Sequence, residues 1–169
     1  LLKHLNEGDF LFISIARYRF AIGDFNGSER KQKYKKLEIV QSRLLDFSKI
    51  AESNRAKIVL IGDIPKVCSS NINYMHEVVR LGNVESCKIK RSISLGDRIG
   101  INNVFNYVAK ISNSAFYVDP HDELCSSSEC GVLDNDNNIL YSDISPHFSK
   151  DKKDVLSNYW SKILTELGI

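Results

Sequence analysis

Residues 57–65 decide the fold, and they read Lys57-Ile58-Val59-Leu60-Ile61-Gly62-Asp63-Ile64-Pro65. Residues Lys57 to Ile61, which are aliphatic after the lysine, predict a short buried strand, as the strands of a parallel sheet are. Glycine and proline are strong turn residues, so we expect the strand to end at residue 61. The run therefore predicts one strand of a buried sheet, and the segments around it decide the type of sheet.

The segment before this strand completes a strand–helix–strand unit. Residues Phe10 to Ala16 form another apolar, β-branched run, which also predicts a strand buried on both faces. Between the two strands, Glu29 to Asn54 is predicted to be one long helix with an apolar stripe at Leu37, Val40, Leu44, Phe47 and Ala51. This order implies parallel strands that are joined by a right-handed crossover.

The segments after residue 65 continue the same pattern. Residues 66–94 are predicted to be irregular, and Leu95 to Ser112 to be a helix. The apolar stripe of that helix is expected at Ile101, Phe105, Val108 and Ile111. A strand over Ala115 to Asp119, a polar hairpin over Gly131 to Asp143 and a helix over Asp151 to Leu167 follow. We therefore expect a single α/β domain over residues 1–169.

The composition is that of a globular domain. Of the 169 residues, 43% are hydrophobic and 26% are charged, and the formal net charge is +2. No nucleic-acid partner is predicted, because the densest basic run, Arg30 to Lys36, is explained by the solvated face of a helix. No apolar run approaches the roughly 18 residues of a membrane span. Since the chain starts at Leu1 without a signal peptide, we expect a fragment or an excised domain.

The four cysteines lie in segments that resemble loops, which favours disulfides and an oxidising compartment. Cys125 and Cys130 could close a small ring and leave Cys68 to pair with Cys87, although the sequence alone allows three pairings. Zinc binding requires two close cysteine pairs, and Cys68 and Cys87 are too far apart to form one. Free thiols in a cytosolic protein remain the alternative.

A short loop near the C-terminus carries the groups with catalytic potential. Asp143 and His147 lie four residues apart, and an aspartate that orients a histidine is part of a Ser-His-Asp triad. The other histidines, His4, His76 and His121, are predicted to lie on the surface. Ligands of open α/β sheets bind at the carboxyl ends of the strands. This rule also singles out Arg17 and the turns after residues 61 and 118.

No serine in the chain is a convincing nucleophile for His147. The Gly62-Asp63-Ile64 segment has isoleucine where a Gly-Asp-Ser block has its serine, and isoleucine has no nucleophilic atom. Residues Ser126 to Ser128 lie inside the expected Cys125–Cys130 ring, and no Gly-x-Ser-x-Gly elbow exists.

Several sequence blocks follow one another in an order that resembles a known family. They are Phe12-Ile13-Ser14-Ile15-Ala16-Arg17-Tyr18, Val59 to Pro65 with Cys68, Tyr117-Val118-Asp119-Pro120, Leu124-Cys125 with Cys130, and Leu140-Tyr141-Ser142-Asp143 with His147-Phe148-Ser149. This order resembles the SGNH (GDSL-like) hydrolase domain that is fused to the C-terminus of membrane acyltransferase-3 proteins. Those proteins O-acetylate cell-surface polysaccharides.

The resemblance implies a three-layer α/β sandwich with a mostly parallel, flavodoxin-like sheet, incomplete at its N-terminus. It makes His147 the general base, Asp143 its orienting carboxylate and Arg17 a substrate contact. The family spaces acid and base as Asp-x-x-His, whereas three residues, 144–146, intervene here. The serine nucleophile is implied to lie upstream of Leu1.

The resemblance further implies an O-acyltransferase that acts on polysaccharide through an acyl-serine, without cofactor or metal. An upstream integral-membrane acyltransferase domain and a polysaccharide acceptor are the implied partners. The implied location is the periplasmic face, where the parent protein tethers the domain to the inner membrane. Two alternatives stay open: a carbohydrate esterase, and a non-catalytic SGNH-like module that binds glycan or another domain.

Overall fold

The structure is a computed structural model that describes residues 4–15, 27–65, 67, 87–96, 99–133, 140 and 153–168. The chain forms two compact units, each made of two chain segments. We name them the sheet unit, Leu1–Asp63 with Gly96–Pro120, and the disulfide unit, Ile64–Leu95 with His121–Ile169. The single-domain organisation of residues 1–169 stays a prediction.

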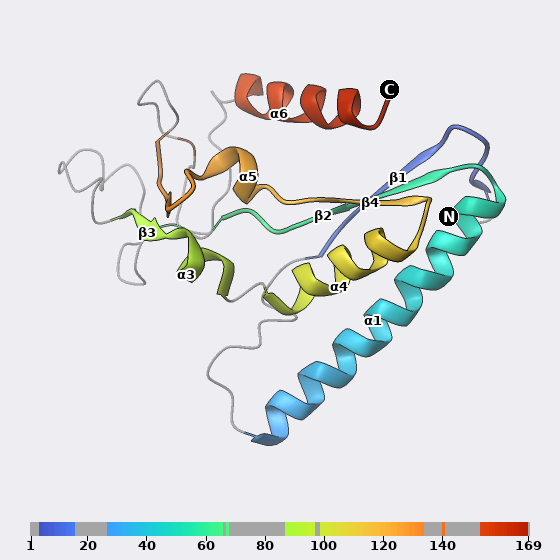
Figure 1. Cartoon of the computed structure of the whole chain (residues 1–169), viewed down its shortest axis with the longest axis horizontal. Coiled ribbons are helices and arrows are strands. Elements are labelled where there is room, and N and C mark those ends of the chain that lie inside the picture. The colour runs from blue at the N-terminus through green and yellow to red at the C-terminus, as the bar shows by residue number, and fades with distance from the viewer. Residues whose placement is uncertain are drawn as a thin grey trace. The chain divides into compact units, whose positions relative to one another are not determined.

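The sheet unit contains three parallel strands, β1 (Phe10–Ser14), β2 (Lys57–Ile61) and β4 (Ala115–Val118). Their order is β1-β2-β4, so β2 pairs with both of the others (Figure 1). The α/β class and the parallel sheet are therefore confirmed, and β2 has the bounds that the sequence predicts.

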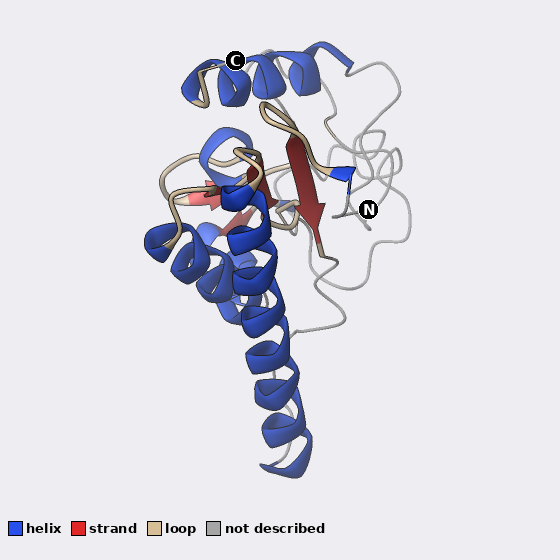
Figure 2. Ribbon diagram, turned by 90° about the vertical axis from the view of Figure 1, so that its right-hand side faces the viewer, coloured by secondary structure: helices blue, strands red, loops and turns tan. Residues whose placement is uncertain are grey.

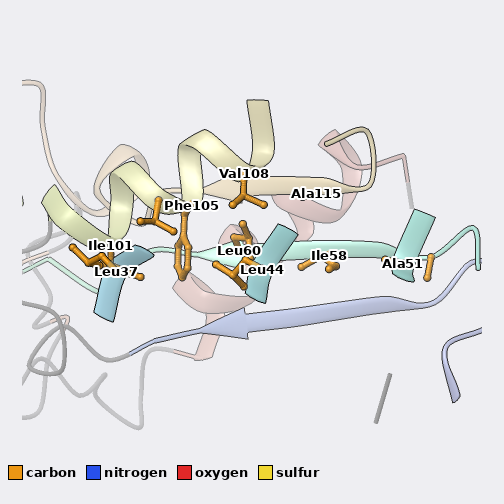
Figure 3. Packing of buried hydrophobic residues seen from close by; sticks show 11 residues of the cluster. Leu37, Leu44, Ala51, Ile58, Leu60, Ile101, Phe105, Val108 and Ala115 are labelled. Carbon is orange, nitrogen blue, oxygen red and sulfur yellow. The ribbon is translucent and has the colours of Figure 1, made fainter. Parts of the chain in front are cut away.

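Two helices pack on one face of this sheet, α1 (Gly27–Ser53) and α4 (Ile99–Ile111). They lie on the same face because the strand order advances in one direction and each crossover has the same hand. Their inner stripes meet β2 in one core, in which Phe105, Ile58 and Leu60 are almost completely buried (Figure 3). The N-terminal part of α1 extends beyond the sheet (Figure 2).

Three details of the sheet unit differ from the predictions. Strand β1 is not buried on both faces: the side chain of Phe12 is 43% exposed, because it points away from the helices at the end of the described sheet. The predicted helix over 95–112 is represented by α4, which begins only at Ile99. Ile111 ends that helix and is 55% exposed, and Val104 joins the inner stripe instead.

The disulfide unit contains α3 (Arg91–Gly96), α5 (His121–Leu124) and α6 (Lys153–Glu166). Its strands, β3 (Ile89–Lys90) and β5 (Glu129–Cys130), form a short antiparallel pair. A small core gathers Val67, Cys87, Cys130, Val132 and Leu140. The Leu140 amide donates a hydrogen bond to the Val132 carbonyl, which joins the two sides of the hairpin predicted over 131–143. The turn of that hairpin lies outside the described residues.

Within the described ranges, no helix is both long and apolar enough to cross a bilayer.

Candidate functional site

The carboxyl ends of the three parallel strands are aligned at one edge of the sheet. The register pairs Ser14 with Ile61 and Ile61 with Val118, so the strands end side by side. Gly62 and Asp63 follow β2 at this edge, and Asp119 and Pro120 follow β4. Ligands of open α/β sheets bind at this edge, so the residues that follow β2 and β4 border the candidate site.

Gly62 brings the two turns at this edge into close contact. Its amide donates a hydrogen bond of 2.9 Å to the Val118 carbonyl. A Cβ atom at position 62 would lie 3.2 Å from Cδ of Pro120 and 3.3 Å from the hydroxyl oxygen of Tyr117. These contacts are tighter than ordinary van der Waals separations, so a Cβ atom fits here only if a neighbouring group moves by a few tenths of an ångström.

We expect Gly62→Ala to lower the free energy of unfolding by about 1–2 kcal/mol, because the added methyl overpacks the contact with Pro120. Thermal unfolding monitored by circular dichroism measures the effect. Gly96→Ala is the matched control, since a Cβ at position 96 meets nothing within 4 Å. Equal melting temperatures for the two variants would contradict this explanation.

The residues predicted to carry catalysis lie outside the part of the chain that the structure describes. This holds for His147, Asp143 and Arg17, and also for Cys68 and His76. Their roles therefore stay predictions that rest on the sequence. What the structure describes is the sheet edge and, in the disulfide unit, a polar network around α5.

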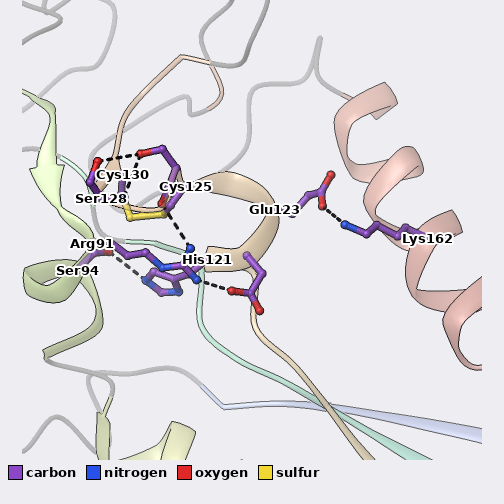
Figure 4. A network of polar contacts seen from close by, with 10 residues as sticks. Arg91, Ser94, His121, Glu123, Cys125, Ser128, Cys130 and Lys162 are labelled. Carbon is purple, nitrogen blue, oxygen red and sulfur yellow. Dashed lines mark hydrogen bonds and ion pairs between the residues drawn. A yellow bond between two sulfur atoms is a disulfide. The ribbon is translucent and has the colours of Figure 1, made fainter.

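That network is organised by Arg91, the first residue of α3. Its guanidinium group forms an ion pair with the Asp122 carboxylate and donates a hydrogen bond of 3.4 Å to the Ser126 carbonyl (Figure 4). Its backbone amide donates to the Ser128 carbonyl at 2.7 Å. Arg91 thus ties α3 to the start of α5 and to the loop between the two cysteines. A separate ion pair of 2.7 Å joins Lys162 on α6 to Glu123 on α5.

His121 corrects a prediction, because it is completely buried and not on the surface. Its Nε2 atom lies 3.1 Å from the Ser94 hydroxyl oxygen, and Ser94 is completely buried as well (Figure 4). A serine beside a histidine has the composition of a nucleophile and its base. Because neither side chain reaches solvent, this pair is structural and joins α3 to α5. His4, in contrast, is exposed as predicted.

The structure pairs Cys125 with Cys130, one of the pairings that the spacing leaves open. Cys87 is disulfide-bonded too, so none of the three described cysteines is a free thiol. One ligand atom of His121 and the two sulfur atoms lie within 4.8 Å of one another, close enough to hold a metal ion. Metal ligation by cysteine requires thiolates, however, and the disulfide leaves neither sulfur in that form.

His121 also shows what sequence reasoning missed. It directly follows the Asp119-Pro120 end of a strand and precedes Cys125 by one helical turn. Both features place it near the core of a disulfide-closed loop, and together they are the signal that could have identified it as buried.

The comparisons with known proteins agree with the arrangement of strands and loops. A family model described as "SGNH domain (fused to AT3 domains)" matches residues 2–162. No curated protein and no solved structure matches the sequence significantly. The match covers nearly the whole chain and includes both units, and it agrees with the resemblance carried by the sequence blocks. The chain therefore belongs to the family of SGNH domains that are fused to AT3 domains.

Proposed function

We propose that this domain is the O-acyltransferase part of a membrane protein and transfers an acetyl group to a cell-surface polysaccharide. The observation that carries the proposal is the family match over residues 2–162, because the family is defined by fusion to AT3 domains. The aligned carboxyl ends of β1, β2 and β4 support it, since this edge is where an α/β domain binds its ligand.

The proposed chemistry is acyl transfer through a covalent acyl-serine. The serine is supplied by residues outside this sequence. Its oxygen attacks the carbonyl of an acetyl donor, the bond between the acetyl group and the donor breaks, and His147 passes the serine proton to the departing group. His147 accepts the proton of a sugar hydroxyl, whose oxygen then attacks the ester carbonyl. The bond to the serine oxygen breaks, a sugar acetate forms, and His147 returns the proton to the serine. Asp143 orients the imidazole of His147, and Arg17 contacts the substrate.

The proposed partners follow from the fusion. An AT3 domain upstream in the parent protein would deliver the acetyl group across the membrane, and a polysaccharide would be the acceptor. This arrangement requires the domain to lie on the periplasmic face, tethered by the parent protein. The three disulfide-bonded cysteines among the described residues suit such an oxidising compartment.

Two other functions are alternatives for the same domain. If water reaches the acyl-serine in place of a sugar, the domain is a carbohydrate esterase. If His147 and Asp143 no longer act as a pair, the domain is a non-catalytic module that binds glycan. The lengthened spacing between Asp143 and His147 is the observation that favours this second alternative.

An acetyl balance on cells that express the full-length parent protein distinguishes the three functions. We expect acetyl esters on the polysaccharide, measured by proton NMR before and after mild alkali, and little free acetate above cells without the protein. Free acetate with loss of existing esters would indicate an esterase. No change in either quantity would contradict both enzymatic functions and favour the binding module.

A further inference from the structure

An open groove lies in the disulfide unit between α3 and the loop that the Cys125–Cys130 disulfide closes. It has a volume of about 490 Å³ and is lined by residues 90–92, Leu95 and residues 127–129. A volume of this size falls in the range that small ligands occupy. The lining comes from two segments that are far apart in the sequence and are joined by the β3–β5 pair.

The walls of this groove are held in place by several interactions. The disulfide closes the loop, and the Ser126 hydroxyl accepts hydrogen bonds from the amides of Ser128 and Glu129. The Arg91 amide donates a hydrogen bond to the Ser128 carbonyl, which joins the two lining segments, and the Arg91 side chain is held by Asp122. These interactions fix the backbone of both lining segments, so the shape of the groove does not have to be ordered when a ligand arrives.

Four polar side chains in this groove have no protein partner among the described residues. They are the ammonium group of Lys90, the carboxylate of Glu129 and the hydroxyls of Ser92 and Ser127. Lys90 and Glu129 lie opposite each other in the β3–β5 pair, so a hydrogen-bond donor and an acceptor lie on the same face of that pair. Arg91 differs from them, because Asp122 already compensates its charge.

The charges on the lining decide which ligand fits. One ammonium group and one carboxylate remain, so the groove has no net charge to attract an anionic or a cationic ligand. A sugar hydroxyl both donates and accepts hydrogen bonds, so it matches a site that offers an ammonium group, a carboxylate and two hydroxyls. Leu95 adds an apolar surface for the C–H face of a sugar ring.

We propose that this groove binds a neutral saccharide unit of the acceptor polysaccharide and disfavours uronate or other acidic sugars. The inference rests on the proposed function for the identity of the ligand as an acceptor, but the binding itself requires no catalysis. It makes Lys90, Glu129, Ser92 and Ser127 the specificity residues of the domain.

Binding is tested on the full chain with neutral gluco-, galacto-, manno- and rhamno-oligosaccharides and with their hexuronate counterparts. Backbone amide shifts in NMR spectra locate the bound probe, and a titration gives its Kd. We expect neutral probes to shift the amides of residues 90–95 and 127–129. Glu129→Gln and Lys90→Met should each weaken binding about tenfold, because each removes a charged hydrogen-bonding group.

Glu52→Gln and Lys110→Met are the matched controls, since both residues are exposed and lie in the sheet unit. They should leave the Kd unchanged. The proposal is overturned if no neutral probe shifts the groove amides at millimolar concentration, if the hexuronates bind more tightly, or if the groove variants bind like the controls. His147→Ala should retain binding, because none of the proposed binding groups belongs to His147. The acetyl balance tests the acyl-transfer proposal and the titration tests the groove, so the failure of one proposal can be distinguished from the failure of the other.

Discussion

Replacing His147 with alanine in the full-length parent protein is expected to lower polysaccharide acetylation by about a thousandfold, within the range for loss of a general acid–base group. The reason is that a neutral sugar hydroxyl is a poor nucleophile, and no other group of the proposed site takes its proton. Acetyl esters per polysaccharide repeat, measured over time by NMR, give the rate. The acyl-serine should still form slowly, since the donor domain is unchanged.

His4→Ala is the matched control for this experiment, because His4 is an exposed histidine outside the candidate site. Its acetylation rate should equal that of the unchanged protein. A His147→Ala variant that is present in the membrane at normal amount and acetylates at the normal rate would refute the catalytic assignment.

Asp143→Asn is a second arm that tests the lengthened spacing between acid and base. If Asp143 orients the imidazole, its replacement should cost nearly as much as that of His147, because the wrong tautomer cannot accept the proton. A loss of less than about tenfold would assign the orienting role to another group, since triad members act as a unit.

The elements that the sequence predicts best are those whose pattern is local. The run of residues 58–61 and the repeat from Leu37 to Ala51 contain their own signals, and the structure shows β2 and α1 at nearly the predicted bounds. The exposure of Phe12 and Ile111 was harder to predict, because it depends on how far the neighbouring elements extend. No pattern within β1 or α4 carries that information.

The candidate site and the groove also differ in how well the sequence predicts them. The carboxyl edge was predictable, since parallel strands always end together and Gly62 and Pro120 mark those ends. The groove was not predictable, because Lys90 and Glu129 become neighbours only through the pairing of two strands of two residues each. Strands that short carry no periodic signal.

His121→Ala is expected to destabilise the protein by about 3 kcal/mol, which combines the cavity left by a fully buried ring with the lost hydrogen bond. The ring connects α5 to Ser94 on α3, 27 residues earlier in the chain. Its loss removes one of the contacts between α3 and α5, whereas the Arg91–Asp122 ion pair and the β3–β5 pair remain. Urea denaturation followed by circular dichroism measures the change, with His4→Ala as the exposed control.

A double-mutant cycle with Ser94→Ala separates the hydrogen bond from the packing. Ser94→Ala alone should cost about 1 kcal/mol, the usual net value of one buried hydrogen bond. The double variant should then be less destabilised than the sum of the two, by about 1 kcal/mol, because the bond can be lost only once. Strict additivity would show that the hydrogen bond between His121 and Ser94 does not stabilise the fold. A His121→Ala variant as stable as His4→Ala would contradict its burial and restore the surface position that the sequence predicts.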